Sequence, residues 1–65
     1  SSAMNLFRGK IDEIQDVGMF KKVEIDCGFS LNSFVTQNSI SRLNLVKGRS
    51  ICAAVKASSI HIFAR

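Results

Sequence analysis

A strict alternation of apolar and polar residues at positions 22–27 constrains the fold more than any other feature of the chain. Val23, Ile25 and Cys27 fall on one face of an extended segment, and Lys or acidic side chains occupy the positions between them. A period of two residues is typical of a β-strand with one buried face. The chain is therefore expected to build its core from strands.

Four other segments show strand-like patterns. Residues 6–14 precede the alternating segment and are expected to pair with it through a hairpin connection at residues 15–18. The remaining strands are expected at residues 30–36, 50–56 and 60–63. The last two carry apolar residues on both faces, so neither face is expected to be fully exposed to water. Such strands fit burial between copies of the chain.

A short helix is expected between the third and fourth strands. Asn38 or Ser39 can cap its start, because a side-chain oxygen there accepts a hydrogen bond from an unpaired backbone N–H group. Ile40 and Leu43 then share one side of the helix, and Asn44 follows where a left-handed residue ends it. Three strands, a short helix and two strands predict an all-β fold, a small five-stranded OB-like β-barrel.

The length of 65 residues leaves room for one domain, residues 1–65, in which residues 1–4 are either a non-native extension or the end of a preceding linker. A chain of about 60 residues buries only about 60% of the surface that its unfolded form exposes, so a single copy is marginally stable. Cys27 and Cys52 are too few for a disulfide framework and lack the paired spacing of a zinc site. A homo-oligomer, at least a dimer, is therefore expected.

No apolar run approaches the roughly 18 residues that a membrane span requires, and no signal peptide is recognised. We therefore expect no membrane insertion and a cytoplasmic location.

Charge is distributed unevenly along the sequence, whose formal net charge is +4. The acidic residues all lie within the first 26 positions: Asp12, Glu13, Asp16, Glu24 and Asp26. Residues 27–65 contain no carboxylate side chain, but they contain the basic residues Arg42, Lys47, Arg49, Lys56 and Arg65. Such a region suits a small anion or a phosphate backbone, and it equally suits a basic surface that only maintains solubility.

The sequence does not support catalysis. His61 is the only histidine and lies between Ile60 and Ile62 in an alternating strand, where a surface or interface position is the ordinary role. Cys27 and Cys52 resemble small apolar core residues, since no base can be placed beside either thiol. We expect no enzyme activity, no bound metal cation and no organic cofactor.

A single-stranded nucleic-acid-binding module is the alternative function, because OB-like barrels often bind such strands. Binding of this kind uses exposed aromatic side chains as stacking platforms. The chain has no Trp or Tyr, and its five Phe residues are scattered and in part expected in the core. Nucleic acid is therefore the less favoured partner.

Small hydrogen-bond donors form the pattern most suggestive of function. They occur at residues 56–59, after the fourth strand, at residues 36–39, before the helix, and at residues 2–5, before the first strand. A tetrahedral oxyanion that is fully deprotonated can only accept hydrogen bonds, so its site needs hydroxyls, backbone N–H groups and a lysine, with no carboxylate nearby. Ser and Thr at strand ends are also common turn formers.

These segments resemble the molybdate-binding TOBE domain, also called molbindin or Mop, over nearly the whole chain. Ser-Ala-Met-Asn-Leu-Phe-Arg-Gly-Lys at residues 2–10 is similar to the opening Ser-Ala-Arg-Asn and Gly-Lys motif of that family. A strand ending in Thr-x-x-Ser at residues 36–39, followed by Leu43-Asn44-Leu45 and Gly48-Arg49, is similar to the middle motif. Lys-Ala-Ser-Ser at residues 56–59 is similar to the third motif of the family, Lys-Ala-Ser/Thr-Ser.

The resemblance implies an OB-like barrel that binds molybdate or tungstate between subunits or paired domains, as a storage protein, a transporter tail or a regulator's sensor. Dimers or trimers of dimers are the assemblies that it implies. Carried over to this sequence, the oxyanion-binding residues are Ser2, Ala3, Met4 and Asn5 of the opening motif, Lys56, Ala57 and Ser58, and Thr36 and Ser39 from the neighbouring copy. Met4 stands where the family has Arg, and a thioether cannot replace a guanidinium, so only the backbone N–H of Met4 is carried over.

Overall fold

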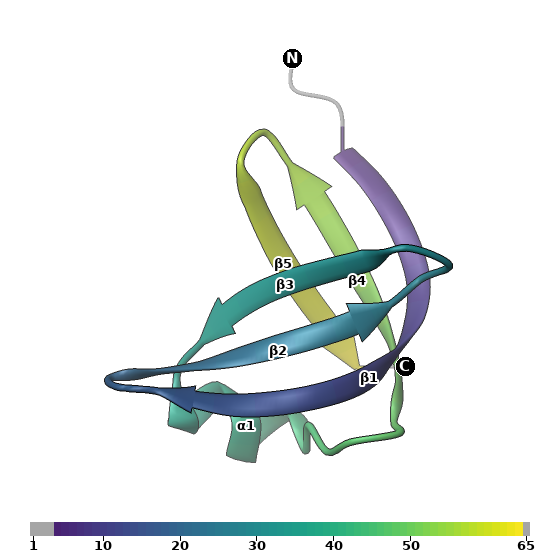
Figure 1. The fold of residues 1–65 in the computed structure, drawn as a ribbon. Coiled ribbons are helices and arrows are strands. Elements are labelled where there is room, and N and C mark those ends of the chain that lie inside the picture. The colour runs from purple at the N-terminus through teal and green to yellow at the C-terminus, as the bar shows by residue number, and fades with distance from the viewer. Residues whose placement is uncertain (1–3, 65) are drawn as a thin grey trace.

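The computed structural model describes residues 4–64, and it consists of five strands and one short helix (Figure 1). Their order is β1 (Met4–Val17), β2 (Phe20–Asp26), β3 (Ser30–Val35), α1 (Gln37–Leu43), β4 (Ser50–Lys56) and β5 (Ser59–Ala64). The predicted sequence of elements, with the helix between the third and fourth strands, is confirmed. Ser2 and Ala3 lie outside the described residues, so the predicted contacts of these two residues stay predictions.

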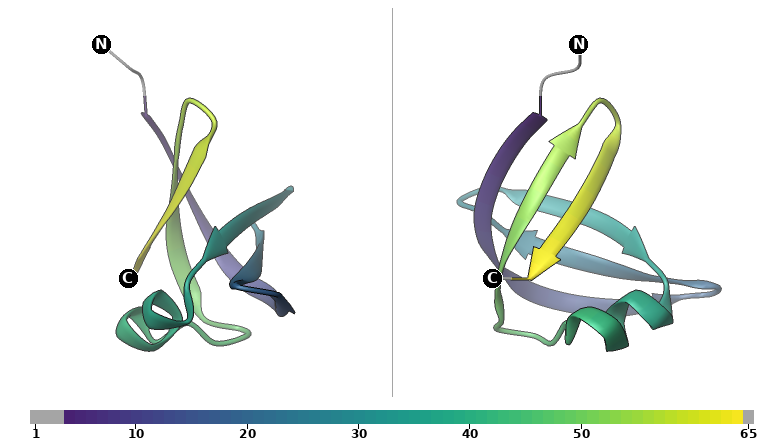
Figure 2. Two further views of the ribbon diagram at one scale, coloured as in Figure 1. Left: turned by 90° about the vertical axis from the view of Figure 1, so that its left-hand side faces the viewer. Right: turned by 180° about the vertical axis from the view of Figure 1, so that it is seen from behind.

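The strands form one antiparallel sheet in the order β3-β2-β1-β4-β5. Strand β1 is shared between two ladders: its second half pairs with β2, and its first half pairs with β4. A register shift between Ile11 and Glu13 marks a β-bulge where β1 passes from one ladder to the other. The strongly bent β1 curls the sheet on itself, as the two views of Figure 2 show.

The predicted barrel is not closed, which corrects the expected architecture in one respect. No strand ladder joins β3 to β5 among the described residues. The two edge strands approach each other at one point, where the Ser33 hydroxyl donates a 3.2 Å hydrogen bond to the carbonyl oxygen of Ile60. A side-chain contact thus replaces a backbone ladder, because β3 and β5 cross at an angle (Figure 1).

The core lies inside the curled sheet and contains the apolar residues predicted from the alternation. Its buried members are Ile11, Val23, Ile25, Leu45, Ile51, Ala53 and Ile62. Cys27 is half-buried and packs against this cluster, as expected of a small apolar residue. Ala53 and Ala54 are both fully buried although they point to opposite faces of β4, so the prediction that neither face of this strand is fully wet is confirmed.

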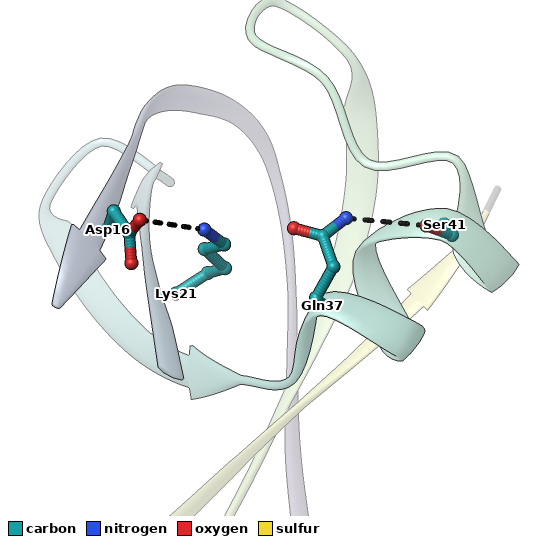
Figure 3. A network of polar contacts seen from close by, with 4 residues as sticks. All are labelled: Asp16, Lys21, Gln37 and Ser41. Atoms are coloured by element: carbon teal, nitrogen blue, oxygen red, sulfur yellow. Dashed lines mark hydrogen bonds and ion pairs between the residues drawn. The ribbon is translucent and has the colours of Figure 1, made fainter. Parts of the chain in front are cut away.

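Strand β1 extends beyond its predicted limits of residues 6–14. Asp16 and Val17, expected in the turn, instead pair with Lys21 and Phe20, so the expected hairpin connection at residues 15–18 was placed too early. The Nζ of Lys21 lies 3.1 Å from Oδ2 of Asp16, an ion pair across the two strands (Figure 3). Gly18 has a φ of +84°, which a two-residue turn accepts from glycine without strain.

Helix α1 begins earlier than predicted, because Thr36 caps it in place of Asn38 or Ser39. Thr36 has extended backbone angles (φ −86°, ψ 161°), and its Oγ1 accepts a 3.1 Å hydrogen bond from the backbone N–H of Ser39. Asn44 ends the helix in the left-handed conformation (φ 60°, ψ 45°), as predicted. The Arg49 guanidinium then donates hydrogen bonds to the carbonyl oxygens of Leu43 and Asn44.

Candidate functional site

The third motif forms the hairpin that joins β4 to β5. Lys56 pairs with Ser59, and Ala57 and Ser58 form the exposed two-residue turn between them. Ala57 has a φ of 54°, a left-handed conformation that is uncommon for a residue with a Cβ atom. Such strain concentrates at binding sites, where the surrounding structure holds it in place.

The described part of the opening motif lies beside this hairpin. Met4 is the cross-strand partner of Lys56, and Asn5 is the partner of Val55. Met4 and Asn5 therefore lie with the third motif at one end of the β1–β4–β5 sheet. Met4, Asn5, Lys56, Ala57 and Ser58 are all exposed there. We call these five residues the hairpin group.

The middle motif lies at the start of α1. Thr36 Oγ1 donates a 3.2 Å hydrogen bond to Ser39 Oγ while it accepts from the backbone N–H of Ser39. Ser39 therefore accepts through its hydroxyl and retains its own hydroxyl proton for an outside acceptor. Gln37 forms a separate hydrogen bond along the helix, in which its Nε2 donates to Ser41 Oγ at 3.3 Å (Figure 3).

A groove of about 780 Å³ lies between β3, α1 and β5 and contains part of the predicted site. Thr36, Ser39 and Ser58 line it, so the structure brings together three of the predicted residues. Lys56 and Met4 are not among its lining residues, although Ser58 of the hairpin group is.

Sequence reasoning missed several polar residues of this groove. Arg42 and His61 line it, as do Asn32, Ser33 and Ser59, and no Asp or Glu is among the lining residues. The spacing of Thr36, Ser39 and Arg42, three residues apart each time, is the signal that could have found Arg42, because side chains at that spacing share one face of a helix. His61 was expected only as a surface or interface residue, and it is exposed.

The outer face of the β1–β4–β5 sheet is apolar although it faces away from the core. Cross-strand rows place Leu6 beside Ala54 and His61, and Arg8 beside Cys52 and Phe63. Leu6 is 60% exposed and Phe63 is 50% exposed. We call the surface formed by Met4, Leu6, Cys52 and Phe63 the outer apolar face. It ends at the hairpin group.

Comparison with known families identifies the chain. The model of the TOBE domain matches residues 1–62. The chain belongs to the TOBE domain family. The resemblance noted in the opening, middle and third motifs is therefore confirmed.

The relatives of this TOBE domain include two molybdate/tungstate import ATP-binding proteins named WtpC. The protein of Pyrococcus horikoshii is 34% identical over 64 residues, which are 97% of this chain and 19% of the relative. The protein of Pyrococcus abyssi is 31% identical over 64 residues, with the same coverage. The chain thus spans about a fifth of the length of these relatives. No solved structure matches it significantly.

The aromatic residues of this TOBE domain are more exposed than expected. The prediction that the Phe residues are in part needed for the core was wrong, because the buried core contains no Phe. Phe7 and Phe29 pack edge to face, with ring centroids 5.1 Å apart. Phe20 and Phe34 are exposed on β2 and β3, and Phe63 lies on the outer apolar face. Phe34 and Phe63 both line the groove between β3, α1 and β5.

The titratable residues of the domain form no metal centre. Within residues 4–64, no group of three or more His, Cys, Asp or Glu side chains is close enough to hold a metal ion. Cys27 and Cys52 are both unbridged thiols. Burial, with smaller contributions from Asp26 and Cys52, raises the pKa of the Cys27 thiol above its ordinary value, which disfavours the nucleophilic thiolate.

In the part of the chain that the structure describes, no helix has the length and apolar character needed to cross a bilayer.

Proposed function

We propose that this TOBE domain binds molybdate or tungstate, without catalysis, at sites completed by two copies of the chain. The observation that carries the proposal is that the two halves of the predicted site, Lys56 and the Thr36 and Ser39 hydroxyls, do not line one common groove. Thr36 and Ser39 line a groove that also includes Ser58 of the hairpin group, but Lys56, paired with Ser59 at the end of β4, is not among its lining residues. A site that needs both halves is completed when the hairpin group of one copy meets the groove of another.

The chemistry of the two halves suits a tetrahedral oxyanion. Molybdate and tungstate carry no proton near neutral pH, so they bind through donated hydrogen bonds and positive charge. The Ser39 hydroxyl, whose proton remains free, and the Lys56 ammonium are donors of these kinds, and no carboxylate lines the groove. An acidic group there would repel the dianion, so the absence of Asp and Glu from the lining supports the proposal.

The outer apolar face supplies a reason for two copies to associate. Burial of Leu6 and Phe63 against a second copy removes apolar surface from water, at about 25 cal/mol per Å². Because the hairpin group borders this face, association through the face places Lys56 at the interface. A dimer, or a trimer of dimers built from it, is the assembly that we propose.

The named relatives favour a role beside a transporter over free storage. Both are ATP-binding proteins of molybdate/tungstate import, so we propose that the domain senses or holds the oxyanion for an importer. ATP is used in the cytoplasm, and we place the domain there. No catalytic step and no organic cofactor are assigned to it.

Calorimetric titration of the chain tests the function directly. We expect stoichiometric binding of molybdate and tungstate, weaker binding of sulfate, and no binding of a short single-stranded oligonucleotide. Tight oligonucleotide binding whose affinity falls steeply with salt would instead support the nucleic-acid alternative. Absence of binding to any oxyanion would overturn the proposal.

Lys56 is the residue on which the site depends most in this proposal. Lys56→Ala should weaken molybdate binding at least about tenfold, because a hydrogen bond to a charged group contributes about 1.5–3 kcal/mol. The fold should persist, since Lys56 is exposed at the end of its strand. Lys10→Ala, which removes the same charge from an exposed position of β1, is the matched control. Met4→Arg should strengthen binding by adding a guanidinium beside Lys56.

A further inference from the structure

We infer that Arg42 supplies the second positive charge of the oxyanion site, from the copy that also contributes Thr36 and Ser39. The inference rests on the proposed function and adds a residue that the three sequence motifs do not contain. It places one cation on each side of the bound ion: Lys56 from one copy and Arg42 from the other.

The geometry of α1 directs Arg42 to the same place as the two hydroxyls. Thr36, Ser39 and Arg42 follow one another at intervals of three residues and all three line the groove. The hydrogen bonds between Thr36 and Ser39 fix the two hydroxyls relative to each other. Arg42 therefore lies about one helical turn beyond these hydroxyls, on the same face.

The electrostatics of the groove leave the charge of Arg42 available. Residues 4–64 form two ion pairs, Lys21 with Asp16 and Lys47 with Glu13, and Arg42 takes part in neither. Its guanidinium also makes no side-chain hydrogen bond within these residues, in contrast to Arg49, which is committed to the carbonyl oxygens of Leu43 and Asn44. A planar guanidinium with several parallel donors matches two oxygens of a tetrahedral anion.

Charge balance explains why a second cation is needed. Molybdate carries two negative charges, and in the hairpin group Lys56 is the only cationic side chain, because Met4 beside it is uncharged. His61 also lines the groove, where its ring nitrogens are possible hydrogen-bond partners. Arg42 is the only permanently charged residue of the groove lining. One Lys56 and one Arg42 together neutralise the dianion.

Three variants test the role of Arg42 by calorimetric titration with molybdate. Arg42→Ala should weaken binding at least about tenfold, and Arg42→Lys should weaken it less, because the charge remains while the paired donors are lost. Lys47→Ala, which removes a charge outside the groove, is the matched control and should bind like the parent. If Lys56→Ala weakens binding and Arg42→Ala does not, the inference fails and the proposed function stands. If the parent binds no oxyanion, both fail.

A mixed dimer tests which copy contributes each cation. Arg42→Ala and Lys56→Ala chains carrying different affinity tags are co-expressed, and the heterodimer is purified through both tags. If the two cations of a site come from different copies, one site of the heterodimer lacks both and the other is intact. We then expect one parental-affinity molybdate per heterodimer, and none in either mutant homodimer. Recovery of no parental-affinity site would overturn the arrangement.

Discussion

At the scale of single residues, Gly9 shows how closely β1 and β2 approach each other at the sheet's bend. A Cβ atom at this position would lie 2.7 Å from the carbonyl oxygen of Asp26, 2.8 Å from Cys27 Sγ and 2.9 Å from Ile25 Cγ2. The glycine is required for space and not for backbone angles, because its φ is not positive.

Gly9→Ala is therefore expected to lower the free energy of unfolding by about 1–3 kcal/mol, as overpacking does in other cores. Urea denaturation followed by circular dichroism measures the loss. Gly18→Ala is the comparison, since a Cβ there meets no atom within 4 Å and only the backbone strain of a positive φ is added. Equal stability of Gly9→Ala and the parent would show that the close approach is absent in solution.

The Cys27 thiol is expected to make the free energy of unfolding depend on pH in the alkaline range. Its pKa in the folded domain is raised above the ordinary value of 9.0, first by burial and then by Asp26 and Cys52. The unfolded chain therefore releases the thiol proton at lower pH than the folded one, so stability is retained below pH 9 and lost as pH rises through the folded pKa.

Urea denaturation at a series of pH values from 7 to 10 should show a steeper loss of stability for the parent than for Cys27→Ala. The difference between the two profiles isolates the Cys27 thiol, because the two proteins share every other titratable group. Parallel profiles would contradict the raised pKa.

At the scale of elements, the order of strands and helix along the chain could be predicted because periodicity is a local property of the sequence. Residues 22–27 showed their buried face directly, and Asn44 marked the end of α1. The cap was misplaced because Thr36, Asn38 and Ser39 can all accept from a backbone N–H, and only the turn out of β3 selects Thr36. The length of β1 was underestimated because its bulge and its change of partner are not visible in a periodic pattern.

The connection after α1 depends on Arg49, whose guanidinium donates to two carbonyl oxygens at the helix end. Arg49→Ala should lower the free energy of unfolding by about 1.5–3 kcal/mol, since hydrogen bonds to a charged donor are lost from a partly buried position. Arg49→Lys should recover only part of this, because an ammonium lacks the planar arrangement of donors. Thermal unfolding of both variants provides the measurement, and full stability of Arg49→Ala would show that water satisfies these carbonyls equally well.

At the scale of the whole molecule, the candidate site could be predicted only in part. The three motifs identified which residues could bind an oxyanion, but no sequence pattern shows that Lys56 lies outside the groove of Thr36 and Ser39. Arg42 was missed because it belongs to no motif and is brought to the groove by the turn from β3 into α1. The curl of the sheet determines which residues from distant elements lie next to each other.

The outer apolar face predicts self-association. Leu6→Lys should convert the oligomer to a monomer in light scattering across a dilution series, because a charge is placed where apolar surface would be buried. The folded copy should keep its stability, since Leu6 is exposed in it. Phe20→Lys, at an exposed apolar position on β2, is the control and should leave the assembly intact. A parent chain that is monomeric at all concentrations would contradict the prediction.

The sharing of β1 between two ladders also determines the order in which the chain can fold. Residues 10–17 meet β2 through a short loop, whereas Met4 meets Lys56 and Lys10 meets Ser50, about 40 to 50 residues away along the chain. Closing the longer loop costs more entropy, so the three-stranded meander of β1, β2 and β3 is favoured to form first. Before β4 pairs with β1, residues 4–9 extend beyond the meander without a strand partner, and Leu6 and Phe7 are exposed to water. Pulsed hydrogen exchange should therefore protect the amides of the second half of β1 before those of the first half.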